Sequence, residues 1–349
     1  MVGRHSDSGM PTTPAQEGFR MPAEWARHDR CIMAWPVRRR VFWGAFYELA
    51  QATYAAVAHA IARFEPVLVV AAPEEAAEAR NRCGREVEVV ELPIDDSWIR
   101  DSGPIFLSAP DGRLAAADFL FNSWGEKYLP YDKDADIGRR LCEHFGVPRY
   151  AAPMVLEGGA ITVDGEGTLI TTESCLLNPN RNPGMTREEI EEVLGTYLGG
   201  ETVIWLQAGV WDDWDTDGHV DGVAAFIRAG AVALHMVREK DHPDYATCLE
   251  NRRRLENATD ARGRTIEVVE IDAETTVDMG GRRVSSCYLN FYLANGAVVV
   301  PTMGTDYDQV ALKQLRAAFP DREVVGVEAA VLGYGGGGVH CITQQMPSR

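Results

Sequence analysis

Hydrophobic side chains recur at helical spacing in five stretches of the chain. Apolar residues three or four positions apart fall on one face of a helix, so each stretch predicts an amphipathic helix. The third helix has the clearest ends, because Thr186 and Glu189 form a capping box before it and Gly199 follows it. The five helices are expected over residues 44–64, 131–145, 187–198, 243–262 and 307–319.

A polar or glycine-rich motif follows each predicted helix, directly or after one short apolar run. Neighbouring motifs are 54 to 68 residues apart along the chain. Five copies of helix, strand, polar motif and strand predict radial repetition about one axis, with the motifs converging at the centre. The motifs are centred on Asp96, Glu157, His219, Cys287 and Cys341.

The predicted fold class is therefore α/β, in the form of a five-bladed propeller with pseudo-fivefold symmetry. One repeat cannot bury its apolar face alone, so the copies should close into one body. We expect a single domain over residues 19–349, although a length of 349 residues by itself favours about two domains. The copies share a pattern far more than they share residues, so one doubly wound α/β sheet remains the alternative.

The first 18 residues differ from the rest, because they are small and polar and show no periodicity. They predict a disordered N-terminal tail without the apolar run of a signal peptide. No stretch of the chain is apolar for long enough to span a bilayer, so no membrane association is expected.

Cysteine spacing and net charge narrow the functional class further. The seven cysteines are scattered, with no C-x-x-C pair and no zinc spacing, which argues against a disulfide framework and favours the cytoplasm. The net charge of −18 argues against nucleic acid or an anionic membrane as a partner. It fits a cationic ligand, or it reflects solubility alone.

The third motif pairs an imidazole with a carboxylate, since His219 and Asp221 are two residues apart. On a strand, residues with this spacing face the same side, so both side chains should face one site. No third ligand has a supporting spacing, and a metal site is not expected. A buried structural histidine and a turn-capping aspartate remain the alternative for this pair.

The last motif presents Cys341 after four consecutive glycines, Gly335–Gly338. Glycines let two backbones approach closely, and a thiol placed there suits a nucleophile better than a core position. A buried cysteine that acts as a small hydrophobe is the alternative. On an extended segment His340 would face away from Cys341, so His219 is the better candidate for its base.

The first two motifs supply further acids. Asp96 and Trp98 alternate, which predicts a carboxylate beside an aromatic wall, while Arg100 and Asp101 are expected to form a structural ion pair or contact the next repeat. Glu157 precedes two glycines, where backbone can be approached closely. For any one of these acids, a solvated surface charge is the alternative.

Carboxylates that face a thiol and an imidazole suit a guanidinium ligand. A guanidinium is planar and always charged, and carboxylates match its N–H groups in pairs. Asp96 and Asp221 would then hold the guanidinium carbon against the sulfur of Cys341. The cation would also favour the thiolate form of that sulfur.

Eight sequence blocks together resemble the agmatine deiminases, which belong to the guanidine-modifying superfamily. The resemblance runs from about residue 18 to residue 347. It implies a pentein fold, the α/β propeller of that superfamily, and hydrolysis of agmatine to N-carbamoylputrescine and ammonia in polyamine (putrescine) biosynthesis. It also implies no metal and no organic cofactor. The blocks cover residues 21–25, 96–104, 121–128, 156–161, 171–184, 215–221, 290–296 and 340–347.

The resemblance also implies catalytic roles, position by position. Cys341 matches the nucleophile that forms a covalent amidino-thioether, His219 the general acid and base, and Glu157 the acid beside that histidine. Asp96 and Asp221 match the carboxylates that clamp the guanidinium. The family usually forms oligomers, often dimers, so a homo-oligomer is expected.

Contacts to the rest of the substrate are expected from Trp98, Trp124 and Gly338. The chain departs from the family pattern at three positions around the pocket. Gly338 and Gly222 stand where the family usually has asparagine, and Thr162 stands where it often has histidine.

Three other functions remain open. A deiminase for arginine or peptidyl arginine should offer an arginine to the substrate carboxylate, and none stands out near the motifs. A non-catalytic pentein that binds a partner should lack at least one of the five catalytic groups, and all five are present. A cysteine protease fits less well, because no Cys–His pair lies beside a peptide-groove signal.

Overall fold

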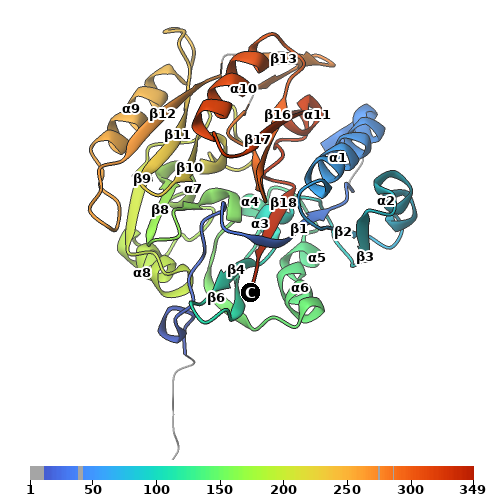
Figure 1. The fold of residues 1–349 in the computed structure, drawn as a ribbon, viewed down its shortest axis with the longest axis horizontal. Helices are drawn as coiled ribbons and strands as arrows, with labels where there is room; N and C mark the ends of the chain where they lie inside the picture. Colours follow the sequence, from blue (N-terminus) through green and yellow to red (C-terminus); the bar gives the residue numbers. More distant parts are fainter. Residues whose placement is uncertain (1–11, 38–41, 274–275, 286) are drawn as a thin grey trace, which may run out of the picture.

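The computed structural model describes residues 12–37, 42–273, 276–285 and 287–349 of the chain. The described strands form one two-stranded hairpin and five larger sheets of three or four strands (Figure 1). In four of them the first two strands are antiparallel and the third is parallel to the second. These four sheets are β4 (Ile105–Ser108), β5 (Leu114–Leu120) and β6 (Arg149–Val155); β7 (Thr162–Val163), β8 (Thr168–Thr172) and β9 (Thr202–Leu206); β10 (Ala224–Arg228), β11 (Ala231–Met236) and β12 (Glu267–Asp272); and β15 (Tyr292–Ala294), β16 (Ala297–Thr302) and β17 (Glu323–Glu328).

The fifth sheet joins the two ends of the chain. Its strands β1 (His28–Ala34), β2 (Val67–Ala71) and β3 (Val87–Glu91) are parallel. The C-terminal strand β18 (Thr343–Pro347) pairs antiparallel with β1. The described strands therefore form separate sheets of at most four strands, and the alternative of one doubly wound sheet is wrong.

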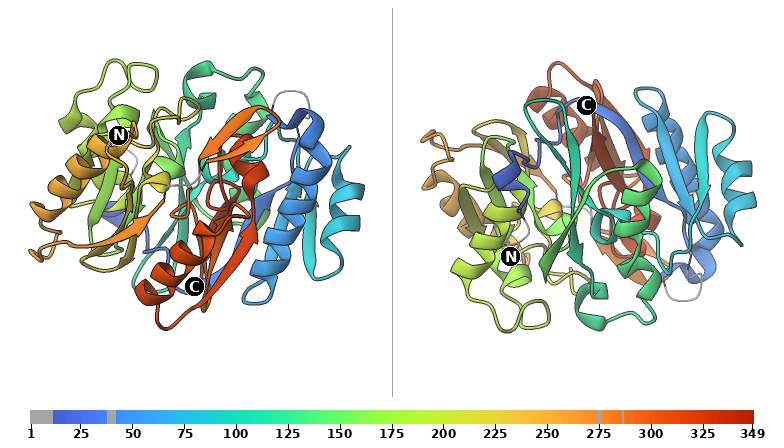
Figure 2. Two further views of the ribbon diagram at one scale, coloured as in Figure 1. Left: turned by 90° about the horizontal axis from the view of Figure 1, so that it is seen from above. Right: turned by 90° about the horizontal axis from the view of Figure 1, so that it is seen from below.

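In each of the five larger sheets, one long helix connects two neighbouring parallel strands, as in a β-α-β unit. These helices lie on the outside of the molecule, where α1, α9 and α10 are clear in Figure 2. All five predicted helices are present, although the second predicted range, 131–145, divides at Asp136 into α5 (Asp132–Ala135) and α6 (Ile137–Phe145). The five long helices are α1 (Tyr47–Ala62), α6 (Ile137–Phe145), α8 (Arg187–Leu198), α9 (Tyr245–Glu256) and α10 (Tyr307–Ala318).

The helix ends follow local chemistry. The capping box of α8 is present, and Gly199 ends that helix with a left-handed φ of 76°. α9 stops six residues before its predicted end, because the side chain of Asp260 accepts the N–H groups of Arg262 and Arg264 and forms a turn instead.

The remaining elements are short. They are α2 (Ala76–Cys83), α3 (Ile99–Ser102), α4 (Ser123–Glu126), α5 (Asp132–Ala135), α7 (Glu173–Leu176), α11 (Ala330–Tyr334), the hairpin of β13 (Thr276–Met279) and β14 (Arg282–Ser285), and the 3-10 turns η1 (Ala15–Glu17), η3 (Gly44–Phe46), η4 (Gly158–Ala160) and η5 (Val220–Gly222).

The five polar motifs occupy equivalent connections. Each lies between the third strand of one sheet and the first strand of the next: Asp96 follows β3, Glu157 follows β6, His219 follows β9, the 285–290 motif follows β12, and Cys341 follows β17. Ser286 of the fourth motif lies outside the described residues. Because the third strands have equivalent places in their sheets, the connections after them point to one region.

The N-terminal segment differs in part from the predicted tail of residues 1–18. Residues 1–11 lie outside the described part of the chain. From Ala15 the chain forms η1, and the backbone N–H of Met21 donates to Leu198 O at 2.9 Å. Burial of Phe19 and Met21 anchors this segment, so the tail prediction is wrong for residues 15–18.

None of the helices in the described ranges has the length and apolar character that crossing a bilayer requires. The seven cysteines all lie within these ranges and are free thiols.

Candidate active site

The glycine loop after α11 places Cys341 among groups from other sheets. A Cβ on Gly337 would lie 2.5 Å from the Trp98 ring and 3.1 Å from Cβ of Cys341. A Cβ on Gly338 would overlap the side chain of Asn290. The close approach expected of these glycines is therefore present, and it brings the thiol against Trp98 and Asn290.

Asn290 holds the cysteine loop and was not predicted as a site residue. Its Nδ2 lies 3.2 Å from Cys341 Sγ. Its Oδ1 accepts the backbone N–H groups of His340 at 3.0 Å and Cys341 at 3.3 Å. Asn290 belongs to the fourth motif, but the repeat spacing was centred on Cys287, three residues earlier.

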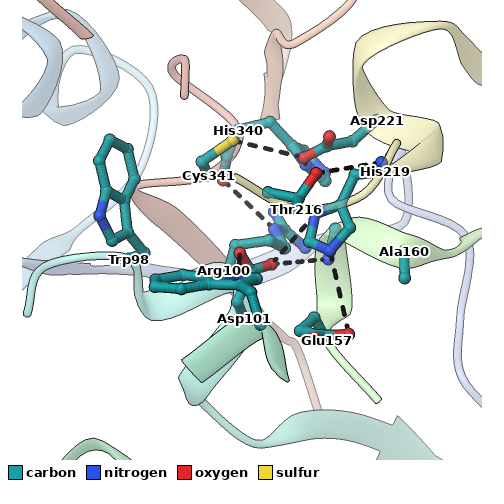
Figure 3. Close-up of polar contacts among 12 residues, drawn as sticks. Trp98, Arg100, Asp101, Glu157, Ala160, Thr216, His219, Asp221, His340 and Cys341 are labelled. Atoms are coloured by element: carbon teal, nitrogen blue, oxygen red, sulfur yellow. Dashed lines mark hydrogen bonds and ion pairs between the residues drawn. The ribbon is translucent and has the colours of Figure 1, made fainter. Parts of the chain in front are cut away.

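Asp221 is the carboxylate nearest the thiol. Its Oδ2 lies 3.5 Å from Cys341 Sγ (Figure 3). His219 and Asp221 lie at the edge of η5 instead of on a strand, but both side chains face the same point. A Cβ on Gly159 would lie 2.5 Å from His219 Nδ1 and 2.9 Å from Asp221 Oδ2, so this glycine lets the two side chains converge.

His340 does not face away from Cys341 as the sequence predicted. The segment is a turn, in which Thr343 N–H donates to His340 O at 3.1 Å, and so neighbouring side chains need not alternate. His340 Nδ1 lies 2.9 Å from Asp221 Oδ2, and Nε2 lies 2.9 Å from Glu24 Oε1. Both ring nitrogens are thus engaged by carboxylates, and His340 has no free nitrogen to act as the base of Cys341.

Arg100 belongs to the same network and does not pair with Asp101, which corrects the predicted ion pair. Its Nη1 lies 3.5 Å from Glu24 Oε1 and donates to Gln344 Oε1 at 2.8 Å. Arg100 and Asp101 are consecutive in the helical turn α3, where adjacent side chains diverge. Arg100, Glu24, His340 and Asp221 form a buried chain of alternating charge.

Asp101 instead faces His219. Its Oδ1 lies 3.8 Å from His219 Nδ1. Trp124 Nε1 donates to Asp101 Oδ2 at 3.0 Å, and Gly159 N–H donates to Oδ1 at 3.0 Å. The tryptophan predicted to touch substrate therefore also orients a carboxylate of the site.

Glu157 lies on the other side of the imidazole. Its Oε2 is 3.9 Å from His219 Nε2, while its Oε1 accepts from Arg181 Nε at 2.6 Å (Figure 3). Both side chains of this Arg–Glu pair are fully buried. The predicted neighbour relation of Glu157 and His219 is present.

Asp96 is buried at the start of the connection that carries Trp98. Its Oδ1 accepts Ser97 N–H at 2.8 Å, and its own backbone N–H donates to Asp134 Oδ1 at 3.1 Å. These bonds fix the backbone of the motif. Trp98 is buried beside Phe42 and Trp43.

A small cavity reaches the thiol. Cys341, Trp98, Trp124, Tyr128 and Asp215 are among its lining residues. A larger cavity adjoins it, since both are lined by Asp215 and Gly336. Gly338, Cys287 and strand β14 line the larger cavity, whereas Gly338 does not line the inner one.

Residues 20–347 match the family described as Porphyromonas-type peptidyl-arginine deiminase. The chain belongs to this family. A Streptomyces avermitilis protein provisionally named agmatine deiminase is 45% identical over 96% of the chain and 99% of its own length. The solved agmatine deiminase of Enterococcus faecalis is 36% identical with a TM-score of 0.93, covering 98% of this chain and 99% of that one. An agmatine deiminase of C. jejuni, solved with substrate bound, is 28% identical with a TM-score of 0.86 over 94% and 96%.

In this member of the deiminase family, the surroundings of Cys341 and His219 raise the pKa of both groups. Burial raises the pKa of the Cys341 thiol, and the carboxylates of Asp221 and Asp101 raise it further. Burial disfavours the His219 imidazolium, but Asp101 and Glu157 outweigh it and raise the pKa of His219 well above its ordinary value. Without a bound cation, the site therefore pairs a thiol with an imidazolium.

The two carboxyl groups beside His219, those of Asp101 and Glu157, have pKa values shifted in opposite directions. Burial raises the pKa of Asp101 to about 6. Burial also works against the Glu157 carboxylate, but the guanidinium of Arg181 and the imidazole of His219 hold its pKa below the ordinary value. Glu157 is therefore the permanently charged neighbour of His219, while Asp101 titrates near neutral pH.

Sequence reasoning missed Asn290, Asp101, Glu24 and Arg181 as parts of the site. All four lie within blocks shared with the deiminases, but none lies at the centre of a repeated motif. Their roles depend on side-chain contacts between segments far apart in the chain. One group of potential metal ligands is also present, namely Glu157, Cys175 and His219.

Proposed function

We propose that this protein hydrolyses the guanidinium group of agmatine to N-carbamoylputrescine and ammonia through a covalent amidino-thioether on Cys341. The observation that carries the proposal is the convergence of Cys341, Asp221 and His219 beside one narrow cavity. The related proteins and solved structures named agmatine deiminase support it.

The reaction begins when the cation enters. A guanidinium beside Cys341 offsets the carboxylates that raise the pKa of the thiol, so the thiol releases its proton to solvent and becomes a thiolate. The sulfur attacks the guanidinium carbon and forms an S–C bond. The His219 imidazolium gives its proton to one nitrogen, which leaves as ammonia, and the amidino-thioether remains on Cys341.

Hydrolysis reverses the role of the imidazole. Neutral His219 takes a proton from water, and the resulting hydroxide attacks the amidino carbon. The C–S bond then breaks, the added hydroxyl passes its proton to the departing sulfur, and the ureido product leaves Cys341 as a thiol beside the His219 imidazolium. Glu157 supports this charged imidazole from Nε2. Asp96 and Asp221 clamp the guanidinium N–H groups during both steps.

Glu24 and His340 are positioning residues for Asp221. Burial disfavours the Glu24 carboxylate, but His340, Arg100 and His28 lower its pKa to about 2, against an ordinary 4.5. Burial and Arg100 disfavour the His340 imidazolium, but Glu24 and Asp221 raise its pKa above the ordinary value. The resulting ion pair fixes Asp221 Oδ2 between His340 and the thiol.

Glu24→Gln should therefore reduce stability in a pH-dependent way. The folded pKa of Glu24 is depressed, so its carboxylate stabilises the fold above about pH 4.5, and that stability is lost as the pH falls toward 2. Near neutral pH the wild type should be more stable by about 3 kcal/mol. Urea unfolding between pH 3 and pH 7 measures the difference. Glu48→Gln, at an exposed position on α1, should leave stability unchanged; an equal loss for Glu24→Gln at every pH would contradict the assignment.

Asp215 is the proposed acceptor of the substrate ammonium. It lines both cavities and accepts a hydrogen bond from the Tyr128 hydroxyl. Arg282 Nη2 lies 3.8 Å away, and Arg282 Nη1 donates to Tyr334 O at 2.8 Å. These contacts hold Arg282. The larger cavity is lined by the acids Asp212, Asp213 and Asp215 and by the two arginines Arg282 and Arg283. The acids outnumber the arginines, which favours a cationic tail over a carboxylate.

Asp215→Asn should raise KM for agmatine by roughly tenfold or more, because a charge-assisted hydrogen bond is lost. The effect on an alkylguanidine without an amine should be much smaller. Steady-state kinetics with both substrates measure the difference, with Asp241→Asn at an exposed position outside both cavities as the matched control. An equal loss for both substrates would mean that Asp215 supports only the fold of its loop.

The test of the proposed function compares ammonia release from agmatine, arginine and a peptide with C-terminal arginine. Agmatine should react fastest, and its product should gain about one mass unit as NH is replaced by O. Faster turnover of arginine or of the peptide would assign the rival substrate. Unchanged substrates after long incubation would favour a binding protein instead of an enzyme.

We also propose a pentein-type five-bladed propeller for residues 19–349, as one domain. The five equivalent connections that lead to one cavity support it. We further propose that the protein forms a homo-oligomer, acts in the cytoplasm and needs no metal or organic cofactor for turnover.

A further inference from the structure

A second thiol lies against the imidazole that the reaction uses. Cys175 belongs to α7, in a different sheet connection from Cys341, and it is buried. One ligand atom each from Glu157, Cys175 and His219 lies within 4.8 Å of the other two. The reaction proposed above gives Cys175 no role.

Buried polar atoms in this group have no hydrogen-bond partner in the described part of the chain. They are Glu157 Oε2 and both ring nitrogens of His219. Glu157 Oε2 and His219 Nε2 face each other across 3.9 Å, which is too long for a hydrogen bond. Unsatisfied buried polar atoms are costly, and convergence of two of them beside a thiol points to a bound cation.

We infer that Glu157, Cys175 and His219 form an inhibitory site for a thiophilic divalent cation such as Zn²⁺. A triangle with sides of at most 4.8 Å has its centre no more than about 2.8 Å from each corner, while zinc bonds to N, O and S are about 2.0–2.3 Å. A contraction of roughly half an ångström completes three bonds, and water supplies the fourth ligand.

The surroundings support the three ligands. Arg181 holds Glu157 through Oε1 and leaves Oε2 for the metal, and Asp217 offsets the arginine charge at 2.8 Å. Asp101 faces His219 Nδ1, which leaves Nε2 as the metal ligand. A carboxylate behind a ligating histidine is the usual outer partner of zinc.

Binding must release protons from the Cys175 thiol and the His219 imidazolium. A thiolate and a carboxylate then match the two charges of the cation, and affinity should rise with pH. A metal on His219 Nε2 prevents the imidazole from transferring protons. Occupancy therefore blocks turnover, and a chelator restores it. Asp101 lines the inner cavity, so the cation reaches the site by the substrate's route.

Calorimetry with zinc chloride tests the site without any need for activity. Wild type and Cys341→Ser should each bind one Zn²⁺, while Cys175→Ser should bind at least about tenfold more weakly. Cys248→Ser removes a buried thiol elsewhere and should bind like the wild type. Loss of binding in Cys341→Ser, with retention in Cys175→Ser, would overturn the inference.

Inhibition gives a second readout. Relative to its own metal-free rate, Cys175→Ser should need at least about tenfold more Zn²⁺ for half inhibition than the wild type. If Cys175→Ser does not fold, Cd²⁺ added to Cys341→Ser should still give the ultraviolet band of one cadmium–thiolate bond. Absence of that band would overturn the site, whatever the fate of agmatine.

Discussion

Cys341→Ser is expected to lower kcat/KM for agmatine by at least about 10³-fold. The thiolate is the nucleophile of the first step and the leaving group of the second, and a serine hydroxyl in the same place is a far weaker nucleophile at neutral pH. Asn290 and Asp221 contact this atom, but an amide and a carboxylate are too weak as bases to deprotonate a serine hydroxyl, and both nitrogens of His340 are occupied. Rates of ammonia release measure the effect.

Cys248→Ser is the matched control for that experiment, because Cys248 is a buried thiol on α9 outside both cavities. It should retain wild-type kinetics. Turnover of Cys341→Ser within tenfold of the wild type would reject Cys341 as the nucleophile.

Asp221→Asn is expected to lower kcat/KM by about 10²–10³-fold or more. Removing one partner of a buried charge pair costs about 3–5 kcal/mol, at about 1.4 kcal/mol for each factor of ten. The amide cannot clamp a guanidinium as a carboxylate does, and it leaves the His340 imidazolium with Glu24 as its remaining anion. The loss should fall on kcat as well as KM, because the clamp also holds the carbon against sulfur.

Asparagine has nearly the same size and shape as aspartate, so Asp221→Asn should fold, and a lower rate would not be explained by unfolding. Asp241→Asn changes the same group at an exposed position and should be neutral. An Asp221→Asn enzyme with normal kcat and a raised KM alone would restrict Asp221 to substrate binding.

The repeated framework was readable from the sequence because it rests on local patterns. Amphipathic spacing located all five long helices, and the capping residues of α8 fixed both of its ends. The motif order also predicted that Cys341, His219 and Asp221 would meet, since repeated connections after equivalent strands lead to one region.

The fine geometry was not readable, because it depends on turns. Alternation along a strand predicted that His340 and Cys341 would face opposite ways, but a turn brings both to Asp221. The same assumption paired Arg100 with Asp101, whereas a helical turn sends Arg100 to Glu24 and Asp101 toward His219. Glu24 lies more than 300 residues before His340, and no local pattern signals that contact.

The proposed mechanism depends on the covalent amidino-thioether on Cys341, and rapid acid quenching during turnover tests for it directly. At saturating agmatine, ammonia should appear before the ureido product. Mass analysis of the digested protein should find the Cys341 peptide heavier by agmatine less one ammonia. An adduct on another residue, or equal rates for both products with no modified peptide at any time, would contradict it.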